Sequence, residues 1–150
     1  MAYQTNTRES TNPDHLSVVV FHSPVGFGVA LFSVTAPIHL LINTETSIAI
    51  AAMILALIGG AYIGFAVADG RRDVFWSELA VALLFGAAAV LGILWHWVAL
   101  PIGLALHAGW DLLHHYSHRL ARIPKWYVPF CVVYDLLAAG FLILLYGAMG

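Results

Sequence analysis

Histidine and aspartate are concentrated in one short stretch of the sequence, HAGWDLLHHYSH at residues 107–118. In a chain of which only 9% of residues are charged, these twelve positions hold four histidines and one aspartate. Helical bundles bind divalent metals with imidazole and carboxylate groups three or four residues apart, and facing helices supply further ligands. Since the donors are nitrogen and oxygen, the stretch favours zinc, iron or manganese over copper(I).

The titratable groups of this stretch share one face of a helix. At about 100° per residue, the face is made by His107, Asp111, His114, His115 and His118. A charge at the centre of a bilayer costs about 3 kcal/mol even on permissive scales. The face is therefore predicted to point into a bundle or a water-filled cavity, and not toward lipid.

The composition predicts the surroundings of this face. Hydrophobic residues make up 61% of the 150, and the mean hydropathy is +0.87, more than a soluble core of this size requires. We expect an all-α, polytopic transmembrane helical bundle. Residues 1–15 are predicted to form a polar tail without the features of a secretory signal, and residues 16–150 a single transmembrane domain. A net charge of −2 with six basic residues argues against a nucleic-acid partner.

Polar interruptions divide the apolar sequence into about five predicted transmembrane helices, each near the roughly 20 residues that span a bilayer. They cover residues 25–42, 47–68, 77–97, 98–118 and 126–149. The first could instead begin near residue 16, with a break at Pro24. In an alternative with four spans, residues 100–115 form a re-entrant or surface segment.

Basic residues give the expected orientation, because Lys and Arg collect in cytoplasmic loops. All six fall on one side of the five-span arrangement: Arg8, Arg71, Arg72, Arg119, Arg122 and Lys125. The N-terminus is therefore predicted to be cytoplasmic.

Acidic residues of the other helices are predicted to meet the histidine face. Asp69 and Glu78 lie at the cytoplasmic ends of the second and third spans, and Asp135 lies about 13 Å into the fifth. The predicted metal ligands are His107, Asp111, His114, Glu78 and Asp69, with Asp135 as an alternative ligand. His115 and Asp135 are the candidate general acid and base. His39 and His96, near the other end, and Trp110 are expected to be structural.

Three segments resemble a family of small bacterial polytopic membrane proteins with no established activity. They are AYIGFAVADGRRDVFWSELAVA (61–82), LHAGWDLLHH (106–115) and VPFCVVYD (128–135), and the resemblance extends over about residues 45–148. The HxxWDxxHH motif of that family is matched by His107, Trp110, Asp111, His114 and His115. Its acidic pair corresponds to Asp69 and Glu78, and its distal YD to Tyr134 and Asp135. The resemblance implies that these residues belong together.

Two classes of function follow. The first is a metal-dependent membrane enzyme, a hydrolase or an oxidoreductase, that acts on a lipid or another apolar substrate entering from the inner leaflet. The zinc-holding membrane hydrolases are similar in style, but the serine they use has no counterpart, since Ser77 and Ser117 lie near the surface. The second is a proton or metal-ion conductor, or a small cofactor-binding subunit of a larger membrane complex. A homo-oligomer is compatible with both. Alternatively, the polar groups only form hydrogen bonds between helices.

Overall fold

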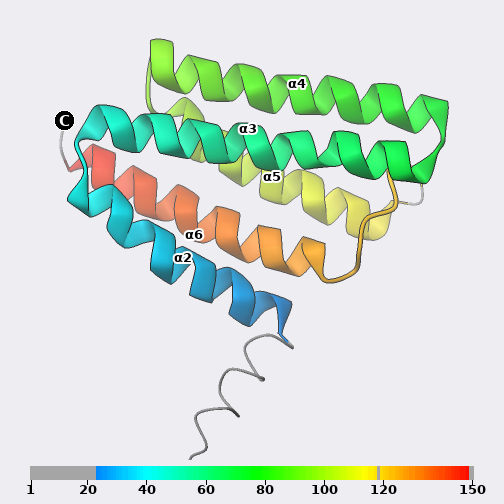
Figure 1. The fold of residues 1–150 in the computed structure, drawn as a ribbon, viewed down its shortest axis with the longest axis horizontal. Helices are drawn as coiled ribbons and strands as arrows, with labels where there is room; N and C mark the ends of the chain where they lie inside the picture. Colours follow the sequence, from blue (N-terminus) through cyan, green and yellow to red (C-terminus); the bar gives the residue numbers. More distant parts are fainter. Residues whose placement is uncertain (1–22, 118, 149–150) are drawn as a thin grey trace, which may run out of the picture.

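The protein is a bundle of long helices. A computed structural model describes residues 23–117 and 119–148, and within these ranges all regular elements are helices. They are α2 (Pro24–Leu41), α3 (Thr44–Asp69), α4 (Arg72–Leu94), α5 (Ala99–Tyr116) and α6 (Tyr127–Gly147). Figure 1 shows them running alongside one another, with α5 behind α3. The predicted all-α bundle is confirmed, and its helix boundaries lie within about five residues of the predicted ones.

Local capping chemistry explains where the first two helices begin and where α3 ends. The side chain of Ser23 accepts a hydrogen bond from the backbone N–H of Gly26 at 3.2 Å, and that of Asn43 accepts one from Thr46 at 2.8 Å. Gly70 closes α3 with φ 79°, the left-handed conformation that glycine adopts without strain. These signals place the start of α2 at Pro24. The alternative start near residue 16, the predicted tail at 1–15 and His118 all lie outside the described residues.

Four of the described helices, α2, α3, α4 and α6, are long and apolar enough to cross a membrane. The fifth, α5, has 18 residues, a length of about 27 Å, but its histidines and aspartate make it too polar to qualify by composition. It is nevertheless one continuous helix packed against α6, α4 and α3. The protein is therefore a multi-pass membrane protein, and α5 is a member of its bundle.

Two helical hairpins and one covering helix form the bundle. The α3–α4 and α5–α6 pairs make the most extensive contacts, and α2 packs against α6. The α2–α6 contact is close at Gly28, where an added Cβ would lie 2.8 Å from the carbonyl oxygen of Phe130. The largest core cluster includes Leu55 of α3, Leu104 of α5 and Leu142 of α6, all fully or nearly fully buried. These contacts position the polar face of α5 against α3, α4 and α6.

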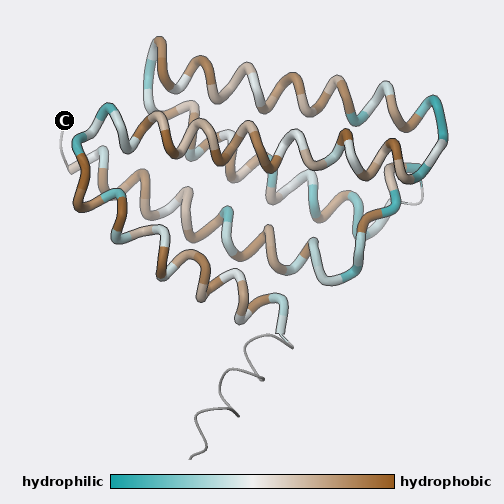
Figure 2. Tube along the Cα trace, in the orientation of Figure 1, coloured by the Kyte–Doolittle hydropathy of each residue, from teal (hydrophilic) through white to brown (hydrophobic). Residues whose placement is uncertain are grey.

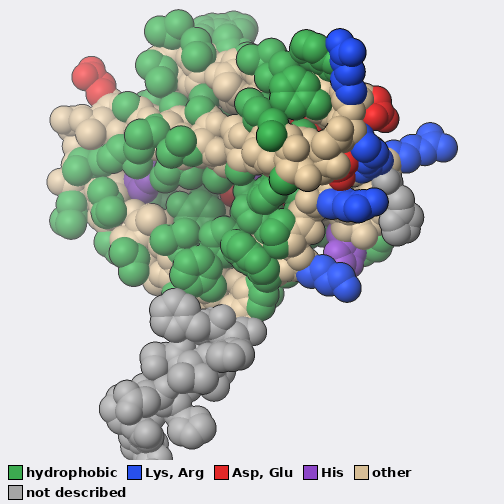
Figure 3. All heavy atoms as spheres, turned by 45° about the vertical axis from the view of Figure 1, so that its right-hand side comes forward, with side chains coloured by type: hydrophobic (Ala, Val, Ile, Leu, Met, Phe, Trp, Pro, Cys, Tyr) green, Lys and Arg blue, Asp and Glu red, His purple; other side chains and the backbone are tan. Residues whose placement is uncertain are grey.

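Charge is distributed unevenly between the two ends of the bundle. Hydrophilic residues gather at the turns between helices (Figure 2), and the Lys and Arg side chains crowd one end (Figure 3). This end contains the α3–α4 turn and the α5–α6 connection, which carry all the basic residues that the structure describes. We call it the basic end. The predicted one-sided arrangement of basic residues holds for the described part of the chain.

Candidate metal centre

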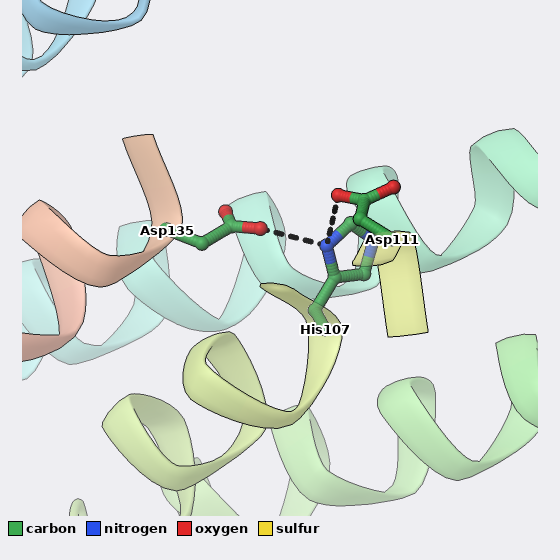
Figure 4. A group of neighbouring side chains, drawn as sticks. All are labelled: His107, Asp111 and Asp135. Atoms are coloured by element: carbon green, nitrogen blue, oxygen red, sulfur yellow. Dashed lines mark hydrogen bonds and ion pairs between the residues drawn. The ribbon is translucent and has the colours of Figure 1, made fainter. Parts of the chain in front are cut away.

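His107, Asp111 and Asp135 converge in the interior of the bundle. His107 and Asp111 lie one turn apart on α5, and Asp135 faces them from α6 (Figure 4). The Nδ1 atom of His107 lies 2.7 Å from Oδ2 of Asp135 and 3.6 Å from Oδ2 of Asp111. All three residues are 0% exposed. We call this group the trio.

Three polar atoms of the trio have no hydrogen-bond partner among the described residues: Nε2 of His107, Oδ2 of Asp111 and Oδ1 of Asp135. A buried polar atom without a partner costs about 1–3 kcal/mol, and nearly all such atoms in proteins are satisfied. One ligand atom from each residue lies within 4.8 Å of the others, a spacing at which a metal ion could be held. The trio therefore has both unused lone pairs and the geometry to bind a cation.

Tyr62 of α3 is a neighbour of the trio that the sequence analysis did not identify. Its hydroxyl donates a hydrogen bond to Oδ1 of Asp111, and its side chain is 0% exposed. The bond orients the carboxylate so that its other oxygen is the one left unpartnered. Tyr62 lies within the segment 61–82 quoted above but is not one of the motif residues, so the sequence analysis gave it no role.

A second polar group lies closer to the basic end. The carboxylate of Glu78 on α4 accepts hydrogen bonds from Nε2 of His114 at 2.9 Å, from the indole of Trp110 at 3.2 Å and from the backbone N–H of Ala121 at 3.1 Å. The other ring nitrogen of His114 lies 3.0 Å from the carbonyl oxygen of Trp110. A carbonyl only accepts, so Nδ1 of His114 donates to Trp110. With Glu78 ionised, Nε2 donates as well, and the two residues form an imidazolium–carboxylate pair.

The hydrogen bonds of His114 and Glu78 decide what these two residues can do. Both ring nitrogens of His114 and both oxygens of Glu78 already have hydrogen-bond partners. The structure therefore brings the predicted ligands His114 and Glu78 to each other and not to the trio. Trp110, which was expected to be structural, binds Glu78.

Tyr62 also connects the two groups through its ring. The ring stacks on His114 with centroids 4.9 Å apart and lies 5.3 Å from the ring of His107. The two imidazoles are about 10 Å apart along α5, so one aromatic ring fills the space between them. Polar contacts and stacked rings thus form one continuous buried network.

The structure does not bring Asp69 and His115 to the trio. Asp69 lies at the basic end, where its side chain is 1% exposed and accepts hydrogen bonds from Arg71 at 2.6 and 3.1 Å and from the backbone of Arg122. The side-chain hydrogen bonding between Arg71 and Asp69 raises the pKa of the Arg71 guanidinium. His115 is exposed, with its ring against Tyr116. Its position one residue after His114 turns it by about 100° away from the interior.

An apolar groove of about 570 Å³ lies beside the network, between α4 and α5. It is lined by Phe85 and Trp110 among others. The ring of Phe85 contacts that of His107 at 5.0 Å, and Trp110 is bonded to Glu78. These two aromatic side chains therefore separate the groove from the polar interior.

A family comparison agrees with the resemblance found in the sequence. Residues 21–149 match a family of unknown function, DUF6010. The chain belongs to this family. The match extends further toward the N-terminus than residue 45, so all five described helices lie inside the DUF6010 region. No curated protein and no solved structure matches the chain.

Proposed function

We propose that this protein binds a divalent transition metal, zinc, iron or manganese, within the membrane, with His107, Asp111 and Asp135 as ligands. One observation carries the proposal. Three fully buried residues converge, and each side chain has one polar atom without a hydrogen-bond partner among the described residues. With a neutral imidazole and two carboxylates the trio has a charge of −2. A divalent cation neutralises it, which matters because a net charge is costly in a bilayer.

Metal binding would use the donors that this arrangement provides. Imidazole and carboxylate ligands suit zinc, iron and manganese. Binding competes with the protons of the ligands, so the affinity rises with pH until the ligands are fully deprotonated. The hydrogen bond from Tyr62 to Asp111 orients a ligand, as outer-shell partners do in metal sites.

We further propose that the bound metal serves a hydrolase or an oxidoreductase whose substrate is a lipid or another apolar molecule. The groove between α4 and α5 supports this, because a chain lying in it meets Phe85, which contacts His107. Movement of that one ring would open the trio to the groove. The trio is fully buried, and the basic end, which is predicted to be cytoplasmic, would supply the water or protons. A bound metal provides a Lewis acid there.

The test is elemental analysis of the purified protein and of isosteric variants. We expect about one metal ion per chain in the wild type. Asp135→Asn and Asp111→Asn are expected to lose it, since each removes a charged ligand and keeps the side-chain shape. His115→Ala is the matched control, because this exposed histidine of the same helix should leave the metal content unchanged. A wild type that binds no metal after supplementation would refute the proposal.

Proton conduction is the second candidate, and a specific observation favours it. In the other half of the bundle, Nδ1 of His39 lies 2.7 Å from the Ser47 hydroxyl, which lies 2.7 Å from the Tyr146 hydroxyl. All three side chains are buried, as the groups of a proton relay are. Proton flux into vesicles by metal-free protein, abolished by Ser47→Ala, would favour this function. A visible absorption band would instead indicate a pigment-binding subunit.

A further inference from the structure

An open cavity of about 530 Å³ lies at the basic end, between the end of α5 and the start of α6. Its polar lining includes His114, His115, Ser117, Arg122 and Lys125. None of the described residues that line it is acidic. The volume is within the range of about 300–1,000 Å³ that is typical of small-molecule sites. The cavity is thus a concave surface with a positive lining.

The positive charge of this cavity is only partly balanced by acidic neighbours. Glu78 lies behind the lining, bonded to His114 and Ala121, and Asp69 accepts two hydrogen bonds from Arg71. The side chain of Arg122 is 90% exposed and its Nε is 3.9 Å from Asp69. Lys125 is also exposed, and it makes no hydrogen bond or ion pair with any residue that the structure describes. Two cations are therefore available to a ligand.

The level of the cavity in the membrane indicates which anion it meets. Tyr116 and Trp126 lie at the ends of the helices on either side and are 78% and 54% exposed. Exposed tyrosine and tryptophan at helix ends mark the headgroup region of a bilayer. Basic residues at this level attract anionic phospholipids. A phospholipid phosphate is therefore the anion that this cavity is expected to meet.

We propose that this cavity binds the headgroup of an anionic phospholipid, with Arg122 and Lys125 as its phosphate contacts. The ligand lies over His114 and Ala121, two of the groups bonded to Glu78. A lipid held there is next to the buried network without entering it. The inference stands apart from the metal centre, because none of its contacts belongs to the trio.

The test compares lipid binding to the purified protein in a non-ionic detergent by native mass spectrometry. Phosphatidylglycerol and phosphatidylcholine with the same acyl chains are added separately, with a chelator present. At about fivefold per cation, two cations predict that the wild type prefers phosphatidylglycerol by about 25-fold. The double variant Arg122→Gln/Lys125→Gln should lose this preference.

The matched control is Arg72→Gln/Arg119→Gln, which removes the same charge from the same end without touching the cavity lining. It should keep most of the preference. Equal loss in both double variants would overturn the proposal in favour of a diffuse surface charge, as would a wild type without preference. Displacement of the lipid by excess inorganic phosphate would overturn the lipid as the occupant. Since the chelator removes metal, none of these results depends on the proposed metal site.

Discussion

Replacement of Glu78 by glutamine tests whether this residue stabilises the bundle or binds the metal. The carboxylate is 0% exposed and accepts three hydrogen bonds, from α5 and from the segment that follows it. In glutamine one oxygen remains, which can still accept from His114 and Ala121. The new amide group must then face the indole N–H of Trp110, donor against donor. The charge that balances the His114 imidazolium is also lost.

These losses set the expected magnitude. Removing one partner of a buried ion pair costs about 3–5 kcal/mol, and the two retained hydrogen bonds favour the lower value. A loss of about 3 kcal/mol in the free energy of unfolding lowers the melting temperature of a chain of this size by about 10 °C. Trp110→Phe removes only one donor to a charged acceptor and should cost about 1.5–3 kcal/mol.

The chain carries its own reporter for this measurement. Cys131 is the one cysteine of the sequence and is buried, so a thiol-reactive fluorophore labels it only when the bundle opens. Glu45→Gln is the matched control, because Glu45 is an exposed carboxylate at the end opposite the basic end. We expect it to melt like the wild type. The metal content of Glu78→Gln is measured on the same samples and should equal that of the wild type.

Two results would refute this reasoning. If Glu78→Gln melts within about 2 °C of the wild type, which is less than 1 kcal/mol, the carboxylate does not pair with a charged His114. If it loses metal as completely as Asp135→Asn while remaining folded, Glu78 is a ligand and the trio is not the whole centre. The second outcome would make Glu78 the metal ligand that the sequence predicted.

Two further predictions concern single contacts. Tyr62→Phe removes the hydroxyl that orients Asp111 and keeps the ring. The metal affinity, measured by competition with a chelator, should fall about 10- to 100-fold with little change in stability. An unchanged affinity would place the metal elsewhere. Gly28→Ala should destabilise the bundle by about 1–3 kcal/mol because the new Cβ would meet the Phe130 carbonyl. Gly60→Ala is the control, because a Cβ there has open space and should not destabilise the bundle. Equal melting temperatures of the two variants would contradict the close α2–α6 contact.

The depth and the facing of the polar residues could be predicted from the sequence. The 3.6-residue period placed His107 and Asp111 on one face of α5, and the cost of charge in lipid turned that face inward. The boundaries of the apolar runs placed Asp135 at a similar depth on α6. All three are buried and adjacent in the structure. These predictions use only periodicity and hydropathy, which a sequence contains.

Which polar side chains contact one another could not be predicted in the same way. It depends on the rotation of each helix about its own axis and on which helices are neighbours, and both are set by packing. Glu78 was predicted as a metal ligand, and in the structure it contacts His114, Trp110 and a backbone N–H that no side-chain pattern reveals. Tyr62 was missed because tyrosine in an apolar helix is ordinarily only a core residue.

The two imidazole–carboxylate groups of α5 differ in one physical respect, and that difference assigns their roles. Around Glu78 and His114 every donor meets an acceptor and the charges cancel, so the pair is complete and a ligand could only disrupt it. Around His107 the donors are too few for the two carboxylates, and three fully buried atoms have no partner among the described residues. A bilayer makes such atoms more costly than they are in a soluble core, because no solvent can replace the missing partner. The incomplete group is therefore the one that a cation would stabilise, and the complete one is the one whose loss would unfold the helices around it.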